Sequence, residues 1–170
     1  MISDEIASLQ GKTSDEQIEV TINIQQDAYI PSTYITEESI RLEMYKKISL
    51  IESLQDKYDV EEEIEDRYSN MPKEITNLTN CAYIRSICRR AKICQVKQKG
   101  DKYELHFAKG CFNPQSFGEI APHRRVSVDL NLKGEPTMTL GLQDVKPGYR
   151  LGELAAVMQE IFDKKSSEEE

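Results

Sequence analysis

At residues 94–108 the sequence reads CQVKQKGDKYELHFA, and at this point the hydrophobic pattern changes its period. Tyr103, Leu105 and Phe107 alternate with polar residues, which is the pattern of a half-buried β-strand. Gly100 and Asp101 separate this run from the one before it, and a glycine in the first loop position suits a two-residue hairpin turn. The stretch therefore predicts an antiparallel hairpin that follows a helical part and opens a strand-rich part.

Helical periodicity precedes the hairpin. Apolar residues at steps of three and four predict three helices, over residues 36–53, 54–68 and 72–92. Thr36 is expected to be the N-cap of the first helix, and Pro72 suits the first position of the third. Asn70 is expected to take the left-handed conformation that ends the second helix.

Strand periodicity appears on both sides of these helices. Alternating apolar residues predict a strand within residues 18–24, and two more within residues 125–132 and 137–142. Residues 151–162 carry the most regular amphipathic helical pattern of the chain, and residues 110–123 are expected to hold a short helix. The fold class is therefore α+β, with N-terminal helices followed by a small, mainly antiparallel sheet and a C-terminal amphipathic helix.

The composition excludes several classes of protein. The chain has 170 residues with a net charge of −8, which fits one acidic domain and not a strongly basic nucleic-acid binder. No stretch approaches the roughly 18 apolar residues that a membrane span needs, and no signal peptide opens the chain. The four cysteines lack the spacing of a disulfide framework or a zinc site, so free thiols in a reducing cytoplasm and no bound metal are expected.

The charge is unevenly distributed, and this points to docking. Residues 1–72 have a net charge of −11, residues 73–130 one of +6 and residues 131–170 one of −3. Glu63 and Asp66 stand three apart on one face of the second helix, within a run of acids. That face is either simply solvated or a charged surface that docks onto a basic partner.

The basic middle allows an alternative. Arg85, Arg89 and Lys92 line one side of the third helix, and segment 85–102 could form a patch that contacts phosphates. A nucleic-acid-binding accessory module would use this patch, but the acidic first half would repel phosphate, so direct nucleic-acid binding is not our first interpretation. The same side chains could equally pair with acidic neighbours. No phosphate loop, dinucleotide fingerprint or nucleophile elbow occurs, so no catalytic residue is expected.

Three blocks of sequence resemble a known family. DAYIP at residues 27–31, RLEMYKKI at 41–48 and EIEDRYSNMP at 63–72 occur in the order and spacing of the C-terminal domain of bacterial transcription-repair coupling factors (Mfd). The family versions read roughly DAYIP, RLxxYKR and ELxDRFGxLP. Tyr68 stands where that family usually has phenylalanine, and Ser69 where it usually has glycine. The resemblance is strong over about residues 18–110 and weak beyond them.

The resemblance implies a function. The parent proteins are ATP-dependent DNA translocases that remove stalled RNA polymerase and recruit the damage-recognition ATPase UvrA. The C-terminal domain is non-catalytic there, and it docks on the parent's own UvrB-like module and hides the UvrA-binding surface. By motif position, Glu63 and Asp66 would make this interdomain contact, and the adjacent Arg67 would either join it or serve packing or the end of the helix instead. ATP and Mg²⁺ would be needed only in motor domains outside this chain, so no cofactor is expected here.

The same resemblance implies a domain layout. Residues 1–17 would be a terminal helix and linker from the preceding motor domain. Residues 18–165 would form the regulatory domain, and residues 166–170 a disordered acidic tail.

Overall fold

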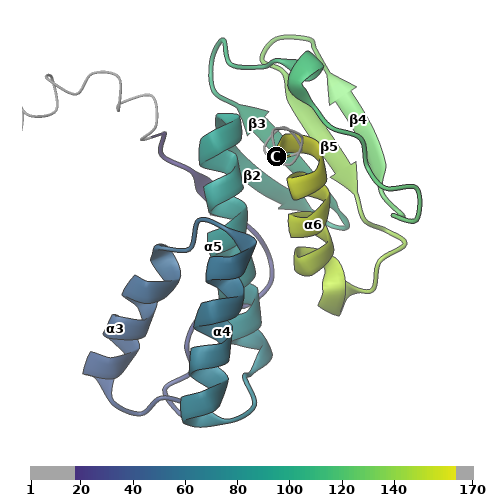
Figure 1. Ribbon diagram of the computed structural model, residues 1–170. Coiled ribbons are helices and arrows are strands. Elements are labelled where there is room, and N and C mark those ends of the chain that lie inside the picture. The colour runs from purple at the N-terminus through teal and green to yellow at the C-terminus, as the bar shows by residue number, and fades with distance from the viewer. Residues whose placement is uncertain (1–17, 164–170) are drawn as a thin grey trace, which may run out of the picture.

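The computed structural model describes residues 18–163 of the chain (Figure 1). The expected terminal helix within residues 1–17 and the expected tail at residues 166–170 lie outside that range. Along the described chain, the helices and strands are β1 (Thr21–Asn23), α3 (Glu38–Ser49), α4 (Leu54–Tyr68), α5 (Lys73–Ala91), β2 (Ile93–Lys99), β3 (Lys102–Phe107), η1 (Pro114–Ser116), β4 (Ser127–Asn131), β5 (Thr137–Gly141), η2 (Pro147–Tyr149) and α6 (Arg150–Phe162). This order confirms the predicted α+β class.

One five-stranded sheet contains all of these strands, in the order β1-β2-β3-β5-β4. The pairs β2–β3, β3–β5 and β4–β5 are antiparallel, and only β1 pairs in parallel, with β2. The predicted hairpin is confirmed, because Lys99 and Lys102 are register partners and Gly100 has a φ of 64° at the turn between them. β1 covers only three residues of the strand expected within residues 18–24.

Helices cover one face of the sheet and continue beyond it. α5 and α6 lie side by side over the sheet, whereas α3 and α4 pack against α5 below the sheet in the view of Figure 1. α5 is the central element, since Ile84, Ile87 and Cys88 are completely buried between the sheet and the other helices. Burial of such side chains is the main source of stability for a domain of this size.

The first helix differs from its prediction at both ends. Thr36 is not the N-cap; Glu37 holds that position, without a side-chain hydrogen bond. The Arg41 side chain instead donates hydrogen bonds to the carbonyl oxygens of Ile35 and Thr36, at 2.8 and 3.1 Å. The helix ends at Ser49 rather than near residue 53, because the Ser53 hydroxyl accepts a hydrogen bond from the Asp56 N–H and caps α4.

The junction between α4 and α5 also differs in detail. Ser69, not Asn70, leaves the helix with a positive φ, of 80°. The Tyr34 hydroxyl donates a 2.6 Å hydrogen bond to the Ser69 carbonyl and helps to hold this turn. Pro72 is the N-cap of α5 and not its first helical residue, and Lys92 ends α5 in the left-handed conformation. Thus a residue other than glycine occupies the positive-φ position where the resembled family usually has glycine.

A long connection, residues 109–126, runs from β3 to β4, and we call it the strap. It contains the expected short helix as the 3₁₀ turn η1. The rings of Phe112 and Phe117 pack on Phe107 and Phe162, with centroid distances of 5.0 to 5.9 Å. The strap is therefore fastened to the sheet and to the end of α6.

Candidate functional site

The acidic residues of α4 lie outward because of the apolar spacing of the helix. Ile64 is completely buried, and Val60 and Tyr68 pack against the core on the same side. Except for Glu61, the acids between them then point away from the core. We call the resulting surface the acidic face, formed by Glu62, Glu63, Glu65 and Asp66.

Glu63 is an internal link as well as a surface acid. Its Oε2 lies 2.6 Å from Lys47 Nζ on α3 and 3.3 Å from Arg67 Nη1 one helical turn later. The hydrogen bond from Lys47 lowers the pKa of the Glu63 carboxyl against the opposing effect of desolvation, and Arg67 contributes in the same direction. The Glu63 side chain remains 34% exposed, so it can still contact a partner while it joins α3 to α4.

Asp66 differs from Glu63 in its surroundings. It is exposed, and within residues 18–163 its side chain forms no hydrogen bond or ion pair. Arg67 is shared between Glu63 and the ring of Tyr68, whose centroid lies 5.3 Å from its guanidinium carbon. Of the three residues predicted to dock, the structure brings Glu63 and Arg67 together and leaves Asp66 available.

A buried polar network, which the sequence did not predict, joins α4 to α5. Lys57 is only 9% exposed, and its Nζ lies 3.1 Å from Glu61 Oε2. The completely buried Thr79 on α5 donates a 2.6 Å hydrogen bond to the same oxygen. The spacing of four between Lys57 and Glu61 was visible in the sequence, but their burial depends on α5. The network fixes α4 on α5, so the acidic face sits on a rigid support.

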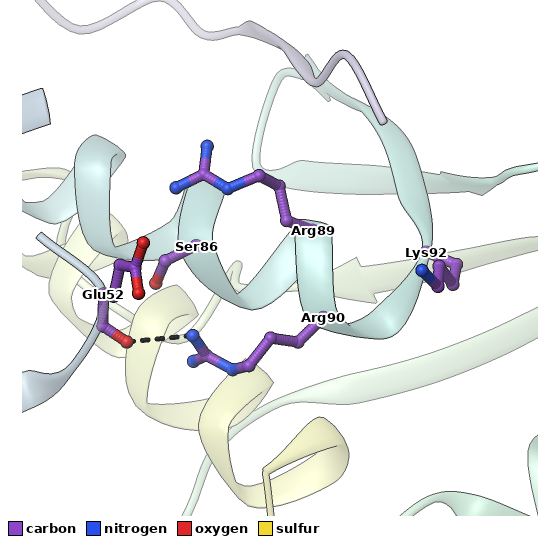
Figure 2. Close-up of a pocket in the computed structure, with 5 residues that line it drawn as sticks. All are labelled: Glu52, Ser86, Arg89, Arg90 and Lys92. Atoms are coloured by element: carbon purple, nitrogen blue, oxygen red, sulfur yellow. Dashed lines mark hydrogen bonds between the residues drawn. The ribbon is translucent and has the colours of Figure 1, made fainter. Parts of the chain in front are cut away.

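The predicted basic residues are only partly gathered. A groove of about 460 Å³ is lined by Glu52, Ser86, Arg89, Arg90 and Lys92 (Figure 2). Figure 2 shows Arg89 and Arg90 extending toward Glu52 and Ser86, while Lys92 stands at the other end. Arg85 is not part of the lining; its charge acts instead on the nearby thiols of Cys81 and Cys88.

Internal partners reduce the basic character of segment 85–102. The Arg90 guanidinium lies 2.8 Å from Asp163 Oδ2 and donates a 2.9 Å hydrogen bond to the Glu52 carbonyl. Lys99 Nζ lies 3.2 Å from Glu104 Oε2 within the β2–β3 hairpin. The segment is thus divided among α5, β2 and β3, and part of its charge is neutralised within the domain.

Two of the four cysteines, Cys81 and Cys88, are buried. All four cysteines are free, and burial raises the pKa of the Cys81 thiol to about 11 and that of Cys88 to about 12. Such thiols stay protonated and poorly nucleophilic at neutral pH. Between residues 18 and 163, no three His, Cys, Asp or Glu side chains are close enough to hold a metal ion. Over the same residues, no helix has the length and apolar character to cross a membrane.

Comparisons with known proteins point to one family. Residues 24–115 match the family model described as the TRCF domain. The transcription-repair-coupling factor of Bacillus subtilis (strain 168) is 32% identical over 139 residues, which cover 79% of this chain and 12% of that protein. That of Staphylococcus haemolyticus (strain JCSC1435) is 31% identical over 87 residues, which cover 51% of this chain and 7% of that protein. The chain therefore matches only a small fraction of the length of these curated relatives.

A solved structure has the same fold. The crystal structure of a C-terminal domain of a transcription-repair coupling factor superposes with a TM-score of 0.71 at 23% sequence identity. The match covers 86% of this chain and 96% of that one. It therefore extends the likeness in fold well beyond the residues matched by the family model.

Proposed function

Because the chain belongs to the TRCF domain family, we propose that it acts as the non-catalytic C-terminal regulatory domain of a transcription-repair coupling factor. In this proposal the domain docks on the UvrB-like module of its own parent protein. Docking covers the surface that recruits UvrA in transcription-coupled nucleotide-excision repair, and release uncovers it. UvrA and RNA polymerase are then indirect partners, the parent is an ATP-dependent translocase working in the cytoplasm, and ATP and Mg²⁺ belong to its motor.

The docking proposal rests on the exposure and the surroundings of the Asp66 carboxylate. This carboxylate is exposed and has no partner within residues 18–163. It stands beside the Glu63–Arg67 pair on a helix that the Lys57–Glu61–Thr79 network joins to α5. An exposed carboxylate on a rigid helix is suited to form an ion pair with a lysine or arginine of another protein surface. Glu63 and Arg67 would add contacts at the rim, although their mutual ion pair limits what each can contribute.

The strength of such a contact suits a reversible clamp. Exposed ion pairs contribute about 0–1 kcal/mol each, so a few of them form a weak interface. A domain tethered to its target has an effective concentration of about a millimolar, which compensates for weak contacts. Such a contact keeps this domain docked on the UvrB-like module while the parent is not translocating. Translocation by the motor can then separate the two domains.

The test uses the full-length parent and measures its affinity for UvrA. We expect Asp66→Ala combined with Glu63→Ala to loosen the clamp and to raise that affinity about fivefold, since two exposed charge contacts are lost. Glu43→Ala, which removes an exposed acid of α3 outside the acidic face, is the matched control and should leave the affinity unchanged. Unaltered UvrA binding by a double variant that remains folded at the temperature of the assay would refute the assignment.

One observation favours a second function. Arg89 lines the groove of Figure 2 together with Lys92, which would suit a phosphate of a nucleic-acid backbone. A nucleic-acid-binding module would shift labelled DNA in a gel, with an affinity that falls steeply as salt is added and that weakens in Arg89→Gln. We expect no such shift, because Asp163 and Glu104 already neutralise part of segment 85–102.

A further inference from the structure

A second groove lies between the first turns of α5 and the start of α6. α5 and α6 run in parallel, since Arg90 meets Asp163 where they end and Lys73 faces the Tyr149 ring where they begin. The groove has a volume of about 610 Å³, within the range of about 300–1,000 Å³ that is usual for ligand sites. We call it the amide groove, and the lining residues that matter for its chemistry are Lys73, Asn77, Asn80, Gly148, Tyr149 and Gly152.

Two glycines keep the amide groove open. A Cβ atom at Gly152 would lie 3.9 Å from Asn80 Nδ2, and one at Gly148 would meet Lys73 Nζ. Farther along α6 the side chains that face the core, such as Leu154 and Met158, are completely buried. Apolar side chains thus pack the two helices together along most of their length. At this end, the polar side chains of Lys73 and Asn80 on α5 face the glycines Gly148 and Gly152, which leaves a gap.

Asn80 is the unusual group in this groove. It is only 7% exposed, yet within the described part of the chain its side-chain amide forms no hydrogen bond. Its neighbour Asn77 donates a 2.8 Å hydrogen bond to the Asp27 carbonyl. In the adjoining recess, which shares Lys73 and Asn77 with the groove, the Oε1 atom of Gln26 is also buried without a partner. Within residues 18–163, Gln26 Oε1 is therefore a buried acceptor without a partner, which is rare in proteins, whereas the Asn80 amide borders the groove; both suit a ligand that supplies hydrogen-bond partners.

The electrostatic potential at the entrance of the groove is positive, because a lysine and two helix N-termini meet there. Lys73 is the first residue of α5, and neither α5 nor α6 has a side-chain cap on its N-terminus. Helix N-termini attract anions through their free N–H groups. Tyr149 is 71% exposed and its ring centroid lies 6.0 Å from Lys73 Nζ, so an apolar surface borders the cation. Glu153 also lines the groove, but Arg124 holds it at 3.2 Å.

We propose that the amide groove binds an extended peptide segment of a partner protein that carries a carboxylate side chain. The Asn80 side chain can donate through its NH₂ group and accept at its carbonyl oxygen, so it can pair with both polar groups of a peptide unit. Lys73 and the two helix N-termini receive the carboxylate, and Tyr149 packs on the flanking residue. A nucleic acid fits less well, because Lys73 is the single cation among the described residues that line the groove, and a chain of phosphates needs several. This site accepts an anion, whereas the acidic face proposed for docking accepts a cation.

The test follows the complete chain by ¹H–¹⁵N NMR while acetyl-Ala-Glu-Ala-Ala-amide is added. We expect saturable shifts of the Asn80 side-chain amide and of the Gly148 and Gly152 backbone amides. The glutamine analogue should bind about threefold more weakly, as the loss of one exposed charge contact predicts. No shift at these groups, equal affinity of the two peptides, or the same shifts with acetate alone or with single-stranded DNA would each overturn the proposal.

Variants separate the groove from general effects on folding. Gly152→Leu fills the space opposite Asn80 and should abolish the shifts, and Lys73→Gln should reduce affinity to that of the glutamine peptide. Lys146→Gln removes an exposed lysine just outside the lining and should bind like the wild type. Asn80→Leu removes the unpartnered amide, so we expect it to lose binding while its melting temperature rises. Unchanged binding by both Gly152→Leu and Asn80→Leu would contradict the proposal.

Discussion

The Glu63 carboxylate holds α3 and α4 together, which makes part of the stability depend on pH. Its folded-state pKa lies below the ordinary value of 4.5 because of the hydrogen bond from Lys47, opposed by desolvation and aided by Arg67. A depressed folded pKa contributes stability that is present above the ordinary value and is lost as the pH falls through the folded pKa.

The prediction compares wild type with Glu63→Gln in urea unfolding at several pH values. At neutral pH the variant should be less stable by about 0.5 kcal/mol, because the link is largely exposed. The difference should shrink as the pH drops below 4.5 and vanish once Glu63 is protonated in both states. A difference that stays constant down to low pH would show that the ion pair is not its cause.

Unlike Glu63, whose ion pairs are partly exposed, Glu61 pairs with buried side chains. Glu61→Ala would leave Lys57 with its charge in a largely dry position, whereas the Thr79 hydroxyl would keep the Thr76 carbonyl as an acceptor. We expect a loss of about 2–3 kcal/mol in the free energy of unfolding, since a buried charge without a partner is costly. Glu62→Ala, the exposed neighbour, should change stability by less than about 0.5 kcal/mol. Equal effects of the two substitutions in urea denaturation would exclude the buried network.

At the scale of elements, β4 is the least covered strand of the sheet. Leu130 and Val128 are register partners of Met138 and Leu140 on β5, so all four point to the same face. Met138 and Leu140 are buried under the helices, but Leu130 remains 47% and Val128 42% exposed. β4 is one of the two edge strands, and Figure 1 shows that it lies beyond α6. An apolar edge of this kind favours self-association.

Matched substitutions on neighbouring strands test this interpretation. Leu130→Thr should cost less than about 0.5 kcal/mol of stability, because half of the side chain is already in water. It should also lower any concentration-dependent association seen in sedimentation velocity. Met138→Thr, its direct register partner, should cost about 2–4 kcal/mol since it removes a core side chain. If Leu130→Thr and Met138→Thr lowered the free energy of unfolding by similar amounts, the apolar side chains of β4 would be buried in solution.

Local periodicity predicted the elements, and tertiary contacts decided the rest. The helix over residues 54–68 and the hairpin around Gly100 have local causes, and both are confirmed. The early end of α3 was missed because Ser53 serves the next helix instead. The alternation of residues 125–132 predicted a strand correctly, but it could not reveal how little of that strand is covered.

The candidate surfaces show the same division. Glu63 and Arg67 are one helical turn apart, so their pairing follows from the sequence. Lys47, the other partner of Glu63, lies on a separate helix, and no local pattern connects the two. Asn80 and Gly152 are likewise far apart in the chain and become neighbours only when α5 and α6 pack. Contacts between elements therefore determine the site more than any motif does.

At the scale of the whole molecule, the acidic face and the basic groove are electrostatically separate. Asp66 lies near the end of α4, next to the start of α5, whereas Arg89 lies near the end of α5. α5 has 19 residues and is therefore about 28 Å long. Charges separated by that distance are screened at physiological salt, where the Debye length is about 8 Å. The net charge of −8 thus averages two surfaces that act independently.

This separation predicts how salt affects the proposed clamp in the full-length parent. Salt screens the contacts of Asp66, so the UvrA affinity of the wild type should rise with salt and approach that of Asp66→Asn. Arg89→Gln should follow the wild type at every salt concentration, because the basic groove takes no part in docking. Binding measurements on the three proteins from low to high salt distinguish these cases. If Arg89→Gln altered the salt dependence as strongly as Asp66→Asn, the two surfaces would belong to one interface, and the acidic face alone would not explain docking.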